Sequence, residues 1–158
     1  MGGPAVFDHK VGIAQQISNY TVLGTASVLW LTDNPTTFSW TNGTPTASTS
    51  NTATGIFVNG VAGNGFQITV PADTNLRTLK LYVGLWYAQG NLEATFSDGS
   101  APGYIDSGLS SNPGTKNGVY TIRFKSASGG QTLKIKYTLL TNYNAPYGNV
   151  TLEAGTLQ

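Results

Sequence analysis

Groups that could do acid–base or nucleophilic chemistry are scarce in this sequence. Its 158 residues include only seven Asp and Glu residues, one His and no Cys. Hydrolysis of a glycosidic bond needs two carboxyl groups at a set separation in a cleft. The available acids are Glu93, Glu153 and five Asp, of which Asp73 and Asp98 lie in turn-like sequences, and His9 lies before the strand pattern begins. No nucleophile elbow or phosphate loop occurs. We therefore predict that the chain is not an enzyme.

Aromatic side chains beside polar groups are the better candidates for function. An exposed ring can cover the C–H face of a pyranose while polar neighbours bind its hydroxyl groups. If Gln89-Gly90 forms a two-residue turn, Trp86 faces Glu93 across a hairpin, and Tyr82 lies on the same outward face beyond Gly84. This register predicts a ligand-binding surface of Trp86, Tyr82 and Glu93. The alternative is that a loop covers both rings, or that they are ordinary cross-strand partners.

Four further aromatic residues are candidates for the same role. Trp30 lies in a stretch that is apolar on both faces, so it fits a sandwich edge, a buried interface or a stacking residue equally well. Tyr104, Tyr143 and Tyr147 lie in expected loops, the last two near several Asn residues. These loop tyrosines could form a binding rim, or be scattered surface residues that need no explanation.

Asp98 and Asp106 are the candidate metal ligands. Calcium takes six to eight oxygen ligands and often fixes loops of extracellular sandwiches. The two carboxyl groups fall in one expected loop, so the two open interpretations are that the chain has no cofactor and that a structural calcium ion binds at this loop. The competing interpretation is that Asp98 before Gly99 is simply favourable turn chemistry.

Composition limits the partners and the compartment. Charged residues make up 9% of the chain and the net charge is +1, which disfavours a nucleic-acid or anionic-membrane partner recognised by bulk charge. The apolar runs are far shorter than a membrane span requires. The absence of Cys excludes disulfides and Cys-ligated metals. This composition is typical of bacterial extracellular modules, so we predict a secreted protein.

The fold that must position these residues is predicted to be all-β. Apolar and polar residues alternate with period two in most segments, and Gly- and Asn-rich turns separate them. We expect an antiparallel β-sandwich, jelly-roll or immunoglobulin-like, of about eight to ten strands. Residues 1–16 read as an N-terminal arm or an artificial start, and 17–158 as one sandwich domain. Residues 44–54 are expected to be a loop or an edge strand. The expected inner faces include Leu81, Val83, Leu92, Phe96, Phe66, Ile68, Ile122, Phe124, Ile135 and Tyr137.

Several stretches, read together, resemble an extracellular bacterial β-sandwich module that occurs in large secreted proteins and is appended to glycoside hydrolases. They are NPTTFSWTNGTP (34–45), GNGF (63–66) with VPAD (70–73), FSDGSA (96–101), ASGGQTL (127–133) and GNVTL (148–152). The resemblance extends from about Gln15 to the C-terminus and implies association with carbohydrate. Asn42 stands where the module has Asp, which argues against cation binding at that turn. Trp30 and Trp86 stand where the module has no fixed aromatic residue.

Two hypotheses of function follow. The first is a non-catalytic carbohydrate-binding module that attaches a secreted protein to a polysaccharide through aromatic stacking. The second is a structural or self-assembling extracellular module, in a filament, surface layer or adhesin, in which Trp30, Tyr82 and Trp86 face protein. An arm held by a neighbouring subunit through strand addition would fit the second hypothesis, and an arm lying on its own sandwich would fit either.

Overall fold

A computed structural model describes residues 6–158, and within this range it contains strands but no helix. No helix among these residues is therefore long and apolar enough to cross a membrane. The first five residues of the predicted arm lie outside the described range. The strands are β1 (His9–Lys10), β2 (Thr21–Leu23), β3 (Leu29–Leu31), β4 (Phe38–Thr41), β5 (Gly43–Thr44), β6 (Ser48–Thr52), β7 (Gly55–Asn59), β8 (Gly65–Ala72), β9 (Arg77–Phe96), β10 (Tyr104–Asp106), β11 (Ser110–Phe124), β12 (Gln131–Asn142) and β13 (Asn149–Leu157).

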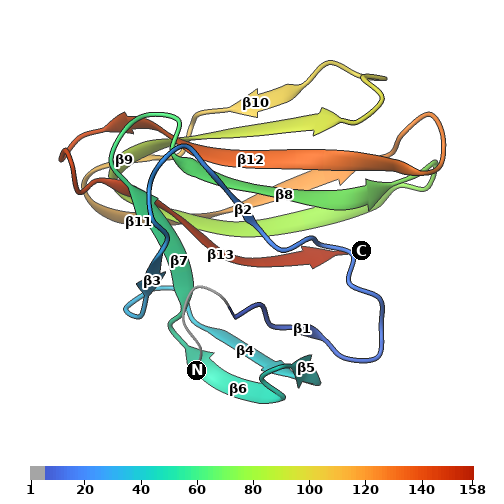
Figure 1. Cartoon of the computed structure of the whole chain (residues 1–158), viewed down its shortest axis with the longest axis horizontal. Coiled ribbons are helices and arrows are strands. Elements are labelled where there is room, and N and C mark those ends of the chain that lie inside the picture. The colour runs from blue at the N-terminus through green and yellow to red at the C-terminus, as the bar shows by residue number, and fades with distance from the viewer. Residues whose placement is uncertain (1–5) are drawn as a thin grey trace.

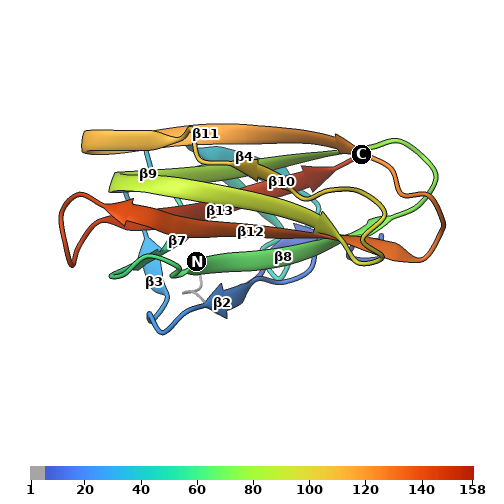
Figure 2. The same cartoon turned by 90° about the horizontal axis from the view of Figure 1, so that it is seen from above.

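The long strand β9 links two layers of antiparallel sheet. Its first half pairs with β11 and β13, and β13 continues to β7 and β3; we call this the lower layer. Its second half pairs with β10 and β12, and β12 continues to β8 and β2; this is the upper layer. Figures 1 and 2 show β9 doubling back at the left-hand end, so that its two halves lie in different layers. The predicted antiparallel β-sandwich is confirmed.

The core lies between the two layers, as the period-two pattern predicts. Eight of the ten predicted inner residues are buried, and the other two, Phe96 and Ile122, are partly buried against the same cluster. Tyr137 crosses the core from β12, where its hydroxyl donates a 3.3 Å hydrogen bond to the carbonyl of Gly84 in the lower layer. Burial raises the pKa of Tyr137 well above its usual value. A buried hydroxyl needs such an acceptor, because an unpaired polar group in the core is costly.

The predicted turn at Gln89-Gly90 is wrong. Gln89 pairs with Ser110 and Thr141, and Gly90 pairs with Leu139, so both residues belong to the sheet. The chain turns earlier, next to Tyr87, whose φ of 45° lies in the left-handed region. The two halves of β9 therefore pair with other strands rather than with each other. Apolar and polar residues alternate on both sides of the bend in β9. The alternation therefore does not reveal that the chain reverses there between two layers rather than within one hairpin.

Strand number exceeds the prediction because the segment after β3 forms small strands of its own. Residues 32–54, which we call the cover segment, contain β4, β5 and β6. Strand β4 pairs with β6, and β5 pairs with β1. Residues 44–54, expected to be a loop or an edge strand, contribute to β5 and β6. Figure 1 shows this group below the lower layer. Phe38 of the cover segment packs edge-on against Tyr82, with ring centroids 5.5 Å apart.

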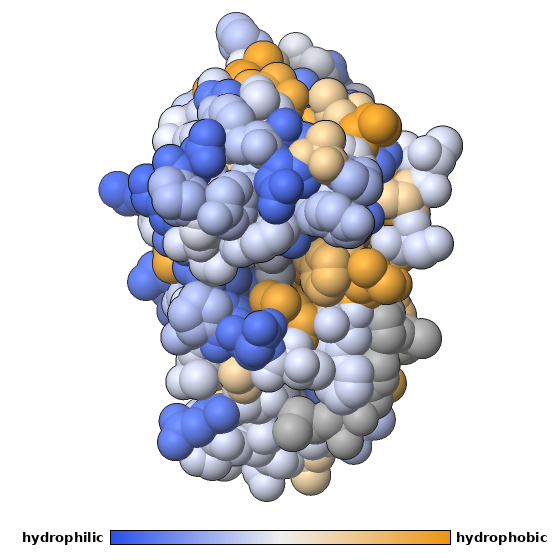
Figure 3. Space-filling model, turned by 90° about the vertical axis from the view of Figure 1, so that its left-hand side faces the viewer, coloured by the Kyte–Doolittle hydropathy of each residue, from blue (hydrophilic) through white to orange (hydrophobic). Residues whose placement is uncertain are grey.

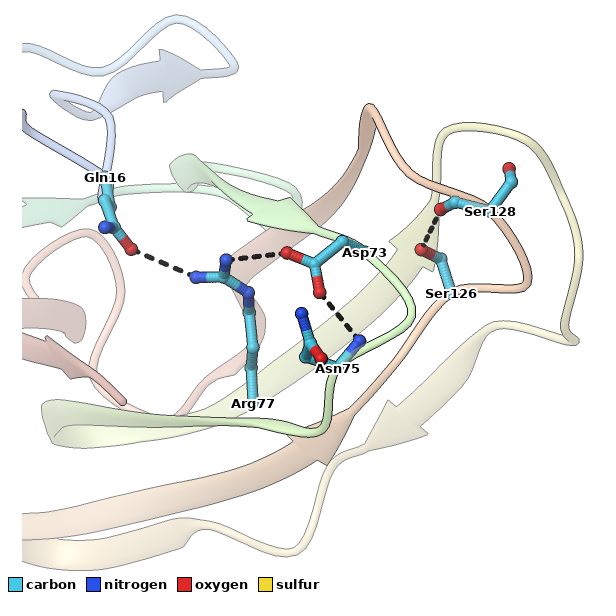
Figure 4. Close-up of polar contacts among 6 residues, drawn as sticks. All are labelled: Gln16, Asp73, Asn75, Arg77, Ser126 and Ser128. Carbon is cyan, nitrogen blue, oxygen red and sulfur yellow. Dashed lines mark hydrogen bonds and ion pairs between the residues drawn. The ribbon is translucent and has the colours of Figure 1, made fainter.

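Within the described part of the N-terminal arm, residues 6–16, Gln16 contacts the chain's own sandwich, and Ser18 just after the arm pairs with β8. The backbone N–H of Ser18 donates to Thr69 of β8 at 2.9 Å. The Arg77 guanidinium bonds both Gln16 of the arm, at 3.1 Å, and Asp73 of the β8–β9 turn, at 2.7 Å (Figure 4). This hydrogen bond from Arg77 holds the pKa of Asp73 below its usual value. In the nearby turn before β12, the hydroxyl of Ser126 donates to the backbone carbonyl of Ser128 at 2.6 Å (Figure 4).

Candidate functional site

One end of the sandwich gathers the segments that carry three of the six candidate aromatic residues, namely Trp86, Tyr143 and Tyr147. The bend of β9, the β7–β8 loop, the β10–β11 connection and the β12–β13 loop meet at the left-hand end in Figure 1. Residues 59–64, 86–90, 107–115 and 139–149 form these segments, and none of them is charged. Figure 3 views the molecule from this end and shows pale and blue polar surface interrupted by apolar residues. Such a surface suits a neutral polar ligand with apolar faces.

Four rings form what we call the loop-end aromatic cluster: Trp86, Tyr87, Tyr143 and Tyr147. Trp86 and Tyr87 are half-buried, and their ring centroids lie 4.6 Å apart at an interplanar angle of 69°. Tyr143 is 40% exposed and Tyr147 is 63% exposed. The backbone N–H of Tyr143 donates to the carbonyl of Tyr87 at 2.9 Å, which joins the two halves of the cluster.

The bend at Tyr87 is an irregular part of an otherwise regular sandwich. A bulky residue in the left-handed region costs roughly 1–2 kcal/mol relative to an extended conformation. The neighbouring strands are irregular at the same level: β11 shifts register between Ser111 and Thr115, and β12 shifts between Leu139 and Thr141. Bulges of this kind redirect side chains and are frequent beside functional sites. Here they allow β9 to leave the lower layer with its rings at the molecular surface.

The β12–β13 loop is held rigidly by one side chain, Asn142. Its amide donates to the carbonyls of Gly60 at 2.7 Å and Gly148 at 3.2 Å, and its carbonyl accepts from the backbone N–H of Asn144 at 3.0 Å. The hydroxyl groups of Tyr143 and Ser110 lie 3.2 Å apart, within hydrogen-bonding distance. Tyr143 and Tyr147 are thus presented by an ordered loop, which reduces the entropy lost when a ligand binds.

The indole N–H groups distinguish Trp86 from the other two Trp residues. Trp30 donates to the hydroxyl of Thr54 at 3.1 Å, and Trp40 donates to the carbonyl of Thr46 at 3.0 Å. The indole N–H of Trp86 has no hydrogen-bond partner among residues 6–158. It is therefore available to a ligand hydroxyl in a way that the other two are not.

The structure separates Tyr82 and Glu93 from Trp86, contrary to the predicted hairpin register. Trp86 pairs with Thr115 and Asn149 in the lower layer. Glu93 lies in the upper layer, where it pairs with Lys136 and makes a 3.6 Å ion pair with that residue. Tyr82 points outward as predicted, but Phe38 covers it. The ring contact comes from strand β4, where the alternative interpretation had placed a covering loop.

Trp30 and Tyr104 lie away from the cluster. Trp30 is 39% exposed on β3, the edge strand of the lower layer. Tyr104, predicted to lie in a loop, is instead part of strand β10, where it is 50% exposed and its hydroxyl donates to Asp106 at 3.0 Å. This hydrogen bond raises the pKa of Tyr104. Neither ring is joined to the cluster by a hydrogen bond or ring contact, so their binding roles stay predictions.

The predicted calcium ligands already have local partners. Asp98 accepts from the backbone N–H of Ser100 at 3.0 Å, and this bond lowers its pKa. Asp106 accepts from Tyr104 with one oxygen and from the N–H of Gly108, at 2.8 Å, with the other. Within residues 6–158, no three His, Asp or Glu side chains are grouped closely enough to hold a metal ion. Calcium at Asp98 and Asp106 stays a prediction.

Sequence reasoning missed Tyr87 and Asn142. In the expected hairpin, Tyr87 would point to the opposite face from its neighbour Trp86, towards the core. Asn142 is one of the Asn residues near Tyr143 and Tyr147, to which no separate role was given. No local sequence pattern indicates a strand bend at Tyr87. The uncharged run of Asn, Gly and Tyr residues in the β12–β13 loop does indicate a polar, aromatic surface.

No family model matches the sequence, and no curated protein matches it. Solved structures do match. A family 61 carbohydrate-binding module in complex with β-1,4-galactotriose is 12% identical, with a TM-score of 0.50 over 89% of this chain and 88% of that one. The family 22 xylan-binding domain of Paenibacillus barcinonensis Xyn10C is 13% identical, with a TM-score of 0.49 over 99% and 94%. A family 36 module in complex with calcium and xylotriose is 7% identical, with a TM-score of 0.40 over 84% and 99%.

At these identities the likeness concerns the fold. The chain shares its β-sandwich with carbohydrate-binding modules, and the predicted resemblance to such a module is confirmed at that level. Proteins that share a fold differ in function through the residues of their sites.

Proposed function

We propose that the chain is a non-catalytic carbohydrate-binding module that holds a neutral polysaccharide at the loop-end aromatic cluster. Tyr147 supplies the most exposed ring, Trp86 supplies a ring edge with an available N–H, and the Asn-rich loop supplies donors and acceptors for hydroxyl groups. The observation that carries the proposal is the convergence of four rings on one uncharged end of a sandwich. Aromatic faces stack on sugar rings, and amides bond their hydroxyls.

Binding without catalysis fits the placement of the two Glu residues. Glu93 lies on the outer face of the upper layer, whereas Glu153 belongs to β13 of the lower layer. Stacked sheets lie about 10 Å apart, and side chains on opposite outer faces are separated further. They cannot flank one glycosidic bond at the separation that hydrolysis needs. We propose further that the module belongs to a secreted bacterial protein, as its low charge and absence of Cys suggest.

The test is a binding screen against neutral polysaccharides, with galactan, xylan and β-glucan as the first probes, by affinity electrophoresis and calorimetry. For the glycan that binds, Tyr147→Ala should weaken binding by roughly thirtyfold, because removing a ring at a binding hot spot costs about 2 kcal/mol. Tyr143→Ala should have a smaller effect, since that ring is less exposed. Tyr104→Ala is the matched control, because its ring is similarly exposed on β10, and it should leave affinity unchanged.

Equal losses in Tyr104→Ala and Tyr147→Ala would place the glycan elsewhere. If no polysaccharide binds and the free protein forms large assemblies that Trp86→Ala breaks up, the self-assembly hypothesis replaces this one. Size-exclusion chromatography with light scattering measures the second outcome on the same samples.

A further inference from the structure

A buried carboxyl group lies outside the proposed glycan site. Glu153 sits in β13 at a bulge, where the register with β9 shifts between Leu152 and Ala154. Both of its carboxyl oxygens are buried, and neither has a hydrogen bond of good geometry within residues 6–158. An ionised carboxylate in such surroundings is costly unless a proton or a cation neutralises it.

The immediate surroundings of Glu153 favour a proton. Its Oε1 and the side-chain oxygen of Asn117 each lie 2.7 Å from the position that a Cβ on Gly84 would occupy. Asn117 uses its amide nitrogen to donate to Asn34 at 2.6 Å and to Thr36 at 2.7 Å. Its oxygen and Oε1 of Glu153 therefore border the same small space over Gly84, and both are acceptors while the carboxyl group is ionised. Two neighbouring acceptors attract each other only when one of them carries a hydrogen atom.

We propose that Glu153 is a protonated carboxylic acid that donates to Asn117 and thereby fastens the cover segment to the lower layer. The connection runs from Glu153 on β13 through Asn117 on β11 to Asn34 and Thr36 in the cover segment. Asn34 extends it to the carbonyl of Thr54, at 3.3 Å, near the other end of that segment. Loss of the proton leaves an unpaired charge under the cover, so the closed arrangement weakens.

The pKa of Glu153 agrees with this arrangement. Burial raises it to about 7 from an ordinary value of 4.5, and the nearby Asn34 amide opposes the shift. The surrounding elements carry these other charged residues, none of which contributes to the shift: Asp33 in the cover segment, Arg77, Lys80 and Glu93 on β9, and Lys116 and Arg123 on β11. Strand β7 carries no charged residue. Tyr137 lies in the core beyond Gly84.

The sign of the pH dependence follows from a pKa that is higher in the closed state. Opening the cover exposes Glu153 to water and returns its pKa towards the ordinary value. The stabilisation of the closed state is therefore complete below about pH 4.5 and is lost as the pH rises through about 7. Because the side chain is only partly shielded, we discount the ideal effect and expect roughly tenfold more opening at about pH 8.5 than at about pH 5.5.

Hydrogen exchange measured by mass spectrometry tests the proposal. Exchange of residues 32–54, corrected for the intrinsic rate at each pH, should rise about tenfold between those two pH values. Peptides from β8 are the internal control and should not change. Glu153→Gln has nearly the same volume and keeps a donor for Asn117, so its cover segment should stay protected at both pH values.

Three results would overturn the proposal. The first is equal protection of residues 32–54 at both pH values in the unaltered protein. The second is an unchanged pH dependence in Glu153→Gln. The third is protection at the higher pH that calcium chloride restores, EDTA removes and Glu153→Gln abolishes, because the buried carboxylate would then hold a cation rather than a proton.

Discussion

Two regions of the lower layer use aromatic residues from the same strand in opposite ways. At the loop end, Trp86 is half-buried against Tyr87, and the neighbouring segment carries the exposed Tyr143 and Tyr147, with no charged residue in the surrounding segments. Four residues earlier, Tyr82 points to the same outward side but lies under Phe38, and a buried carboxyl group is enclosed nearby. An outward position on a strand therefore does not by itself make a binding surface. What the rest of the chain places over that position decides its role.

The two regions differ in the chain segments that lie over them. The covered face is closed by a segment far from β9 in sequence, through the bonds of Asn117 to Asn34 and Thr36. The loop end is framed by short connections that are held from within by Asn142. The first region is expected to govern stability, and the second is expected to govern binding. Substitutions directed at one region at a time can separate these roles.

The largest effect is expected from Gly148→Ala at the loop end. A Cβ there would overlap the side-chain oxygen of Asn142 and lie 2.6 Å from the carbonyl of Tyr87. Backbone cannot move aside cheaply, so we expect a loss of roughly 3 kcal/mol in the free energy of unfolding, at the upper end of overpacking costs. Glycan affinity should fall at least tenfold, because the loop that presents Tyr143 and Tyr147 shifts. Thermal denaturation and calorimetry measure the two effects.

Gly129→Ala is the control for this substitution, because nothing lies within 4 Å of its added Cβ. It should change neither stability nor affinity appreciably. A Gly148→Ala variant that kept full glycan affinity would show that the order of the β12–β13 loop does not matter for binding.

The sequence predicts well which residues face the core of the sandwich, but it predicts poorly where the chain passes from one layer to the other and which segments cover the outer faces. Period-two alternation identified core residues such as Leu81, Leu92 and Ile135, because alternation records which face of a strand is buried. It could not identify the bend at Tyr87, because the pattern continues through the bend. It also could not show that Phe38 covers Tyr82, since that contact joins residues 44 positions apart that share no local signal. Tyr143 and Tyr147 were predicted as binding residues because their segment is polar and aromatic, and this role stays a prediction.

A smaller effect is expected from Phe38→Ala on the covered face. Removing a half-buried ring from Tyr82 should lower the free energy of unfolding by about 1–2 kcal/mol. Exchange should increase in β4 and β6, while glycan affinity should not change, because the loop-end aromatic cluster is intact. A loss of affinity comparable to that of Tyr147→Ala would mean that the cover segment belongs to the binding site. Stability and binding would then not be divided between the two regions.

The smallest effect is expected from Glu93→Gln, which tests whether the sequence-predicted partner of Trp86 has any part in binding. Glu93 lies on the upper layer with Lys136 at 3.6 Å, and both side chains remain more than one-third exposed. Exposed ion pairs contribute about 0–1 kcal/mol, because water and salt screen them. The free energy of unfolding of the variant should therefore lie within about 0.5 kcal/mol of the parent's, and the difference should shrink further in high salt.

The glycan affinity of Glu93→Gln should be unchanged, because this carboxylate and Trp86 lie in different layers. A marked loss of affinity with normal stability would instead place the polysaccharide across the polar outer face of the upper layer. Lys134 of β12 and Thr95 of β9 pair with each other on the same two strands. Titration of one glycan against Glu93→Gln and Tyr147→Ala in parallel separates these two outcomes.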